Sequence, residues 1–131
     1  MIAVLDASAA VGVVLLQPAA MSLIQSLESA TLVLTPDLFV SEVCNALWKY
    51  RKAELLTREE TDLALSRALA LPDRFEPAFA CYQEAFAIAE RYQHPFYDAL
   101  YLVIARRNNA LLLTFDKRLV ALAVRLDVAV M

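Results

Sequence analysis

The chain opens with the stretch IAVLDAS at residues 2–8, in which four apolar residues run directly into Asp6. Ser8 then opens an alanine- and valine-rich segment that continues to Leu16. A short, unbroken apolar run predicts a strand buried on both faces, and the segment after it predicts a helix that ends near Pro18. Strand followed by helix is the repeating unit of an α/β fold.

The alternation continues along the rest of the chain. Further strands are predicted at 31–35, 110–114 and 128–131, while residues 75–79 fit either a short strand or an irregular turn. Further helices are predicted at 19–29, from 37 to beyond 50, and at 57–71, 80–92, 96–107 and 116–126. Right-handed crossovers bring the carboxyl ends of parallel strands to one edge of the sheet, where such sheets bind ligands. We therefore expect one α/β domain over residues 1–131, with a parallel sheet covered on both faces.

Three local signals mark helix ends. Asp37 can cap the long helix that follows it, and Thr57 with Glu60 three residues later is a capping-box signature. Asn108-Asn109 suits a left-handed stop for the helix before it, because asparagine adopts that conformation more readily than most residues.

The composition is strongly apolar: 60% of the 131 residues are hydrophobic. A domain of this length hides roughly two-thirds of its unfolded surface. Because the apolar content of this chain exceeds what such a core needs, apolar surface is left for a partner, and we expect a homodimer. No apolar run reaches the roughly 20 residues of a membrane span. The first run also differs from a secretory signal, because Asp6 interrupts it, whereas the apolar segment of such a signal is continuous. We expect a cytoplasmic protein. Cys44 and Cys81 show no CxxC spacing and are expected to be buried free thiols.

The net charge of −3 argues against a generally basic nucleic-acid surface. Cations nevertheless gather at three places, which are Lys49 with Arg51 and Lys52, Arg106 with Arg107, and Lys117 with Arg118. The first two groups end helices, where cations are favourable without any ligand. The candidates for contacts with a nucleic acid are Lys49, Lys52, Lys117 and Arg118.

Four acids stand at the ends of apolar runs or inside strongly apolar helices, and these are Asp6, Glu42, Asp98 and Asp116. Each alone has an ordinary explanation as a helix cap, a first-turn charge or a solvated side chain. Together they are harder to explain in that way, because acids are seldom buried without partners and converging carboxylates repel one another. A divalent cation between them would remove that penalty.

Oxygen ligands without clustered histidine or cysteine favour Mg²⁺ or Mn²⁺ over zinc or copper. Such an ion, alone or in a pair, activates water and neutralises charge on a phosphate, so the predicted chemistry is hydrolysis of a phosphodiester. Asp6 and Asp98 are the expected direct ligands. Glu42 and Asp116 are expected to act directly or through water.

Four motifs of this chain, taken together, resemble a known family. They are VLDAS at 4–8, PDL at 36–38 with EVCNAL at 42–47, YDALY at 97–101, and LTFD at 113–116 followed by Leu119. In this order and at these separations they resemble the PIN domain, especially the VapC-type toxins of bacterial and archaeal toxin–antitoxin pairs. The resemblance covers essentially the whole chain.

The resemblance implies a three-layer α/β/α sandwich with a central parallel sheet and a Mg²⁺- or Mn²⁺-dependent endoribonuclease site. It places Asp6, Glu42, Asp98 and Asp116 in the acidic cluster, with Ser8, Asn45 and Thr114 as polar neighbours that orient carboxylates or metal-bound water. It also implies an RNA substrate and a VapB-like antitoxin, whose C-terminal segment lies in a groove beside the acids and often offers them a basic side chain.

The chain departs from the family pattern at two turns. Glycine is usual before the YDA motif and before the TxD strand, whereas this chain has YQHP at 92–95 and Asn108-Asn109. His94 could touch substrate but is expected to be a turn residue. Trp48 and Tyr101 are expected on helical core or partner faces rather than in a platform for base stacking.

Other functions remain open. A PIN-domain nuclease of RNA processing or DNA metabolism would have no antitoxin, and a catalytically silent binding protein would keep the acids without cleavage. Phosphatases that form a phospho-aspartate need a second acid where this chain has Ser8, and nucleotide-binding folds need a glycine-rich first turn, whereas the only glycine is Gly12, inside the first helix. Both classes are excluded.

Overall fold

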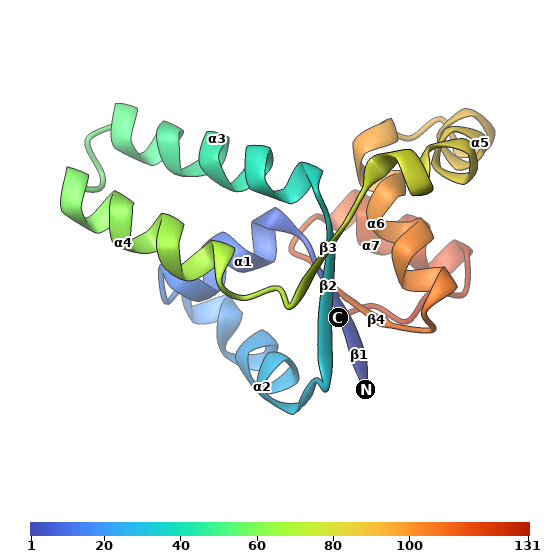
Figure 1. Cartoon of the computed structure of the whole chain (residues 1–131), viewed down its shortest axis with the longest axis horizontal. Helices are drawn as coiled ribbons and strands as arrows, with labels where there is room; N and C mark the ends of the chain where they lie inside the picture. Colours follow the sequence, from blue (N-terminus) through green and yellow to red (C-terminus); the bar gives the residue numbers. More distant parts are fainter.

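Four parallel strands form a single sheet in the order β3-β2-β1-β4 in the computed structural model, which describes residues 1–131 (Figure 1). The strands are β1 (Ile2–Leu5), β2 (Leu32–Pro36), β3 (Arg74–Glu76) and β4 (Leu111–Leu113). In the register of the sheet, Ala3 pairs with Val33 of β2 and with Leu111 of β4. The first strand is therefore central, and its apolar run is buried on both faces as predicted.

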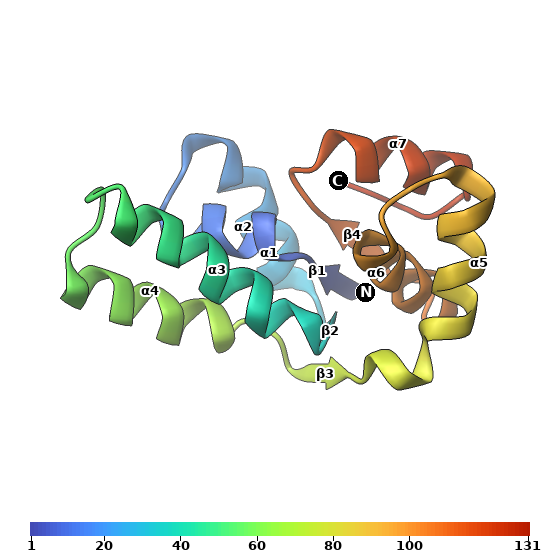
Figure 2. The same cartoon turned by 90° about the horizontal axis from the view of Figure 1, so that it is seen from above.

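Helices cover both faces of the sheet (Figures 1 and 2). They are α1 (Ala7–Val14), the 3₁₀ turn η1 (Pro18–Ala20), α2 (Met21–Ser29), α3 (Leu38–Lys52), α4 (Arg58–Leu69), η2 (Ala78–Ala80), α5 (Tyr82–Tyr92), α6 (Phe96–Arg107) and α7 (Lys117–Arg125). Helices α1 to α4 lie on one face and α5 to α7 on the other, which confirms the predicted three-layer α/β/α sandwich.

The alternation of side chains along β1 divides the core in two. Ala3 and Leu5 pack with the apolar stripe of α3, whereas Val4 packs with α6 on the opposite face. Every residue of α6 from Ala99 to Ala105 is buried, because this helix lies between the sheet and the outer helices α5 and α7. Charged side chains on α6 are therefore confined to its two ends, and Asp98 lies at the first of them.

Two of the three helix-end predictions are confirmed. Thr57 and Glu60 form a reciprocal capping box at the start of α4, and Asn109 has a left-handed φ of 48° after α6. The prediction for Asp37 is wrong: its side chain does not cap α3 but accepts a hydrogen bond from the Ala78 N–H at 3.1 Å. Asp37 thus ties the start of α3 to η2.

The ambiguous segment and the last predicted strand also differ in detail. Residues 75–79 contribute to the short edge strand β3 and to the 3₁₀ turn that follows. Residues 128–131 form only an isolated parallel bridge, Val130 with Leu112, because the chain runs beside β4 for too few residues to build a ladder.

The prediction for the thiols is half right. Cys81 is buried, but Cys44 is exposed, since α3 turns its neighbour Val43 to the core instead. No single helix is long and apolar enough to cross a bilayer. Helix α1 and the segment Pro18–Ser29 meet that test only as a pair, by length and composition, and they are bent by 111°.

Candidate active site

Strand register brings two of the predicted acids to the same edge of the sheet. Leu5 pairs with Leu113 at the ends of β1 and β4, so Asp6 and Thr114 leave the sheet side by side. The Asp6 N–H donates to the Leu113 carbonyl at 3.1 Å, which extends the ladder by one step. The convergence expected at the carboxyl ends of the strands is thus present.

Asp6 is held by three donors. One carboxylate oxygen accepts hydrogen bonds from the Ser8 hydroxyl at 2.7 Å and the Ala9 N–H at 2.9 Å, and the other accepts from the Thr114 hydroxyl. The residue is only 5% exposed. Burial raises its pKa, the three hydrogen bonds oppose that rise, the charge of Glu42 adds to it, and the result is a pKa of about 6.

The two hydroxyls join the loop after β1 to the loop after β4. Thr114 Oγ1 accepts from the Asp116 N–H at 3.0 Å, and Ser8 Oγ accepts from the Phe115 N–H at 3.0 Å. Asp116 in turn caps α7 by accepting from two backbone N–H groups, those of Arg118 at 2.9 Å and Leu119 at 3.2 Å. The predicted polar neighbours Ser8 and Thr114 are therefore in place.

Glu42 reaches the site from α3 and is held by a residue that sequence reasoning assigned to the core. The Tyr101 hydroxyl, on a side chain that is 1% exposed, donates to the Glu42 carboxylate at 2.7 Å. Burial raises the pKa of Glu42, the bond from Tyr101 opposes the rise, and the charge of Asp98 adds to it. The sequence held a signal, because Tyr101 follows Asp98 by three residues and so shares its side of α6.

Asp98 lies in the first turn of α6 and is held by His94. The Nε2 atom of His94 lies 2.8 Å from Asp98 Oδ2, and the histidine side chain is 7% exposed. Burial raises the pKa of Asp98 and the charge of Asp116 adds to the rise, while the His94 bond and the charges of His94 and Arg118 oppose it. His94 is a turn residue as predicted, but its ring also belongs to the site, as its spacing of four residues before Asp98 could have indicated.

The four acids are electrostatic neighbours without forming a ready-made ligand shell. The charge of Glu42 acts on Asp6, that of Asp98 on Glu42, and that of Asp116 on Asp98, each raising the pKa of the carboxyl it faces. As the side chains stand, no three His, Cys, Asp or Glu groups are close enough together to hold a metal ion. The donor chemistry nevertheless fits a hard divalent cation, because all four groups offer oxygen and repel one another.

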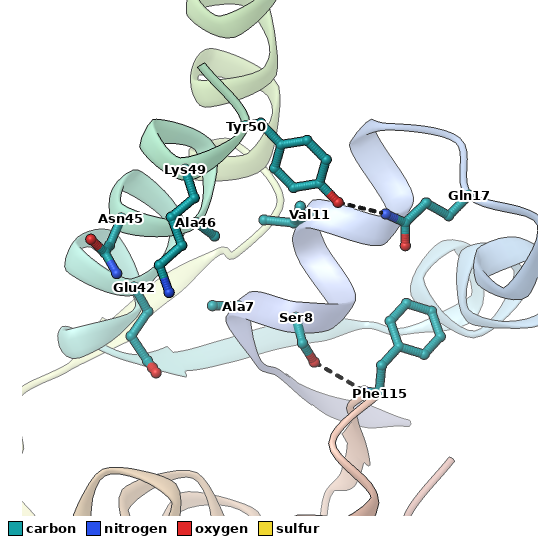
Figure 3. Close-up of a pocket in the computed structure, with 10 residues that line it drawn as sticks. All are labelled: Ala7, Ser8, Val11, Gln17, Glu42, Asn45, Ala46, Lys49, Tyr50 and Phe115. Carbon is teal, nitrogen blue, oxygen red and sulfur yellow. Dashed lines mark hydrogen bonds between the residues drawn. The ribbon is translucent and has the colours of Figure 1, made fainter. Parts of the chain in front are cut away.

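A groove of about 490 Å³ opens beside the acids, between α1 and α3 (Figure 3). It is lined by Ala7, Ser8, Val11, Gln17, Glu42, Asn45, Ala46, Lys49, Tyr50 and Phe115. Asn45 and Lys49 follow Glu42 along the same side of α3, and Figure 3 shows the Lys49 side chain extending toward Glu42. The Gln17 side-chain amide donates to the Tyr50 hydroxyl at 3.1 Å across the groove.

The predicted nucleic-acid cations are not all beside the acids. Lys49 lines the groove, and Arg118 is close enough to Asp98 to affect its pKa. Lys52 instead lies over the half-exposed Trp48 ring, with its Nζ 5.2 Å from the ring centroid. Lys117 is exposed at the start of α7 and makes no ion pair.

Comparisons with known proteins agree with this architecture. A protein named Ribonuclease VapC3, from Pyrobaculum aerophilum, is 33% identical over 91 residues, which span 65% of this chain and 66% of that protein. The crystal structure of PAE2754 from Pyrobaculum aerophilum superposes with a TM-score of 0.69 at 26% identity, over 93% of this chain and 87% of that one. The crystal structure of FitAcB from Neisseria gonorrhoeae shares the fold with a TM-score of 0.59 at 21% identity, over 100% and 96%. The model of the PIN domain family matches residues 3–125, and the chain therefore belongs to that family.

Proposed function

We propose that the protein is a metal-dependent endoribonuclease of the VapC type, which acts as the toxin of a toxin–antitoxin pair. The observation that carries the proposal is the group of carboxylates beside one edge of the sheet, in which the buried Asp6 is held by Ser8 and Thr114 while Tyr101 holds Glu42 and His94 holds Asp98. A ribonuclease at 33% identity supports the same chemistry. Perturbed acids that face one another beside a groove are typical of catalytic sites.

The metal we propose is Mg²⁺ or Mn²⁺, with Asp6 and Asp98 as direct ligands and Glu42 and Asp116 acting directly or through water. When bound, the ion would supply activation of water and neutralisation of charge on the phosphate. Hydrogen bonds from Ser8 and Thr114 fix the Asp6 carboxylate in one orientation, so that little ordering remains to be done when a cation binds.

The antitoxin is proposed to occupy the groove between α1 and α3. Apolar side chains such as Val11 and Phe115 line this groove together with Glu42 and Asn45. A peptide with apolar anchors and one basic side chain would fit it, since that side chain would pair with carboxylates that repel one another. Lys49, which also lines the groove, would favour a carboxylate or carbonyl oxygen of the peptide next to that basic side chain.

A homodimer is also proposed. Exposed aromatic side chains follow one another at helical spacing along η2 and α5, where Phe79 is 85% exposed and Phe86 is 61% exposed. Burial of such a face against a second copy would remove apolar surface from water. Light scattering of the wild type and of Phe86→Glu tests this, with a dimer mass expected for the first and a monomer mass for the second.

The nuclease proposal is tested with purified protein and single-stranded RNA. We expect cleavage that EDTA abolishes and Mn²⁺ restores, and that falls at least about 100-fold in Asp6→Asn and Asp98→Ala, since both remove a charge from the metal set. The matched control is Asp62→Asn, which removes an exposed charge on α4. Calorimetry of Mn²⁺ binding gives a second readout, in which the two site variants lose binding and the control keeps it.

Expression in cells separates the competing functions. A toxin arrests growth unless its antitoxin is expressed with it, and Asp98→Ala removes the arrest. Cleavage of RNA or DNA without arrest favours a housekeeping nuclease. Binding of RNA with no cleavage under any divalent ion contradicts the enzyme and favours a silent binding protein.

A further inference from the structure

A second cavity, of about 200 Å³, lies between the turn that precedes α6 and the outer helix α7. It is lined by Tyr92, His94, Arg118, Ala121, Leu122 and Arg125. None of these residues lines the groove between α1 and α3, so the two hollows are separate. We call this one the α7 pocket.

The α7 pocket adjoins the acidic site through two residues. His94 lines the pocket and also binds the Asp98 carboxylate at 2.8 Å. Arg118 lines it as well, and this side chain lies close enough to Asp98 for its charge to oppose the rise in pKa that burial causes. The groove meets the acids at Glu42, whereas the α7 pocket meets them at Asp98. The carboxylates therefore lie between the two hollows.

The cations of the α7 pocket form no salt bridges. Arg118 and Arg125 form no ion pair, in contrast to Arg106 and Arg107, which both pair with Glu84 at 3.5 and 2.8 Å. The Arg125 guanidinium lies over the Tyr92 ring, 4.8 Å from its centroid. Stacking holds that planar group in place while leaving its N–H donors free.

Because two exposed guanidinium groups without salt bridges line one small cavity, their N–H donors are available to an anion there. The guanidinium fork matches two oxygens of a phosphate, and Tyr92, Ala121 and Leu122 provide an uncharged wall beside it. No carboxylate lines the pocket, whereas the groove between α1 and α3 has Glu42 in its wall. A phosphate is thus favoured here over the basic side chain that suits the groove.

We propose that the α7 pocket is a phosphate-binding subsite, in which Arg118 and Arg125 hold a phosphodiester of the RNA strand next to the one that is cleaved. This inference rests on the proposed nuclease function. It adds the path of the RNA strand, which runs from the acids past Asp98 and over α7. The two arginines act in binding and positioning, so their loss weakens substrate affinity.

Anisotropy of a fluorescein-labelled, mixed-sequence 12-nucleotide RNA tests the subsite, with EDTA present to prevent cleavage. For Arg118→Gln/Arg125→Gln we expect affinity to fall about tenfold at low salt, and the slope of log K against log salt to flatten by about 0.7 for each lost phosphate contact. Arg125→Lys keeps the charge without the stacked fork, so it should restore the slope but only part of the affinity. The matched control is Arg67→Gln, which removes an exposed arginine from α4 on the other side of the sheet and should change affinity less than about twofold.

Steady-state cleavage with Mg²⁺ or Mn²⁺ completes the test. The double variant is expected to raise KM about tenfold, whereas Arg125→Gln, which keeps the Arg118 charge near Asp98, is expected to raise KM with kcat within about twofold of the wild type. If the wild type cleaves RNA and the double variant matches it in affinity, salt slope and KM, the subsite is wrong while the nuclease function stands. If the wild type neither binds nor cleaves RNA, the proposed function itself fails. If the double variant binds RNA normally but no longer binds the antitoxin, the pocket takes an acidic peptide, and the proposal is overturned.

Discussion

The two acids at strand ends and the two acids on helices are held in different ways. Asp6 and Asp116 follow β1 and β4, and each caps the helix it opens, Asp6 by accepting from one backbone N–H group and Asp116 by accepting from two. Glu42 and Asp98 lie on helices, and each depends on one side chain that comes from α6 or from the turn before it. Strand register therefore fixes the first pair, whereas helix packing and a single partner fix each member of the second.

The largest expected effect on stability comes from the buried member of the strand-end pair. Asp6→Asn removes a carboxyl whose folded pKa is about 6 in place of 3.8 and keeps an acceptor oxygen. A folded pKa above the unfolded one means that stability is greatest below the unfolded pKa and is lost as pH rises through the folded pKa. The shift corresponds to about 3 kcal/mol, so at about pH 7.5 without divalent ions we expect Asp6→Asn to unfold at a higher urea concentration than the wild type.

Urea midpoints of the two proteins at about pH 7.5 and about pH 4 check this prediction. The gap should close at the lower pH, where the Asp6 carboxyl is protonated in the folded wild type. Asp62→Asn, which removes an exposed acid from α4, is the matched control and should stay within about 0.5 kcal/mol of the wild type. A gap of equal size at both pH values would rule out the buried charge as its cause.

The next effect concerns the hydroxyl that joins the two strand-end loops. Thr114 donates to Asp6 and accepts from the Asp116 N–H, so Thr114→Val leaves both groups without this partner. Losing a hydrogen bond to a buried charged group costs about 1.5–3 kcal/mol, and we expect a loss of about 2 kcal/mol at about pH 7.5. The same bond lowers the pKa of Asp6 against the larger effect of burial, so the loss should shrink at about pH 4, where the carboxyl is protonated.

Thr114→Ser is the control for that variant, because it keeps the hydroxyl and removes one methyl group. Urea denaturation should show most of the wild-type stability in Thr114→Ser and a clear loss in Thr114→Val. Similar losses in the two variants would mean that packing of the methyl group, and not the hydrogen bonds, is what Thr114 contributes.

The strand-end half of the site could be predicted from the sequence because local patterns determine it. An apolar run that ends in an acid and continues as a helix places that acid at the carboxyl end of a strand, and parallel pairing then brings Asp6 beside Thr114. The capping box at Thr57 and the left-handed Asn109 were predicted for the same reason, since each depends on a few neighbouring residues.

The helix half could be predicted only in part. Glu42 and Asp98 were identified, but their partners were not, because a tyrosine in an apolar helix is indistinguishable from a core residue until the helices are packed. Which carboxylate accepts a hydrogen bond from the Tyr101 hydroxyl depends on how α3 is placed relative to α6. The α7 pocket was missed for the same reason, since Tyr92 and Arg125 are far apart in the sequence and meet only through packing.

The wrong predictions have different origins. Asp37 has the residue type and position of a helix cap, but the neighbouring η2 offers its carboxylate the Ala78 N–H instead. Cys44 lies among apolar residues of α3, yet the register of the helix turns it outward. A tertiary contact decided the case of Asp37, whereas the position of Cys44 outside the buried stripe of Phe39, Val43 and Leu47 decided the second case.

A smaller effect is expected at Gly12, which lets the loop after β4 pack against α1. A Cβ added there would clash with the ring of Phe115, the residue between Thr114 and Asp116. Alanine favours a helix by about 1 kcal/mol over glycine, while overpacking typically costs about 1–3 kcal/mol, so we expect a net loss of about 1 kcal/mol for Gly12→Ala. Thermal unfolding measures it, and Phe115→Leu in the same chain should remove the loss. Stabilisation by Gly12→Ala alone would show that the ring has room to move.

The smallest expected effect on stability tests most directly whether the helix acids are held less firmly than the strand-end acids. Tyr101→Phe keeps a ring that is 1% exposed and removes only the hydroxyl that holds Glu42 at 2.7 Å. Glu42 is half-buried and can bind water instead, so we expect a loss of about 0.5–1 kcal/mol at about pH 7.5 in urea denaturation, at most half of that for Thr114→Val. Burial raises the pKa of Glu42 and the Tyr101 bond opposes that rise, so the variant's pKa should lie higher still, and carbon NMR of the labelled carboxyl can follow it. If Tyr101→Phe costs as much as Thr114→Val, the helix acids are held as firmly as the strand-end acids, and single-partner anchoring is not what distinguishes them.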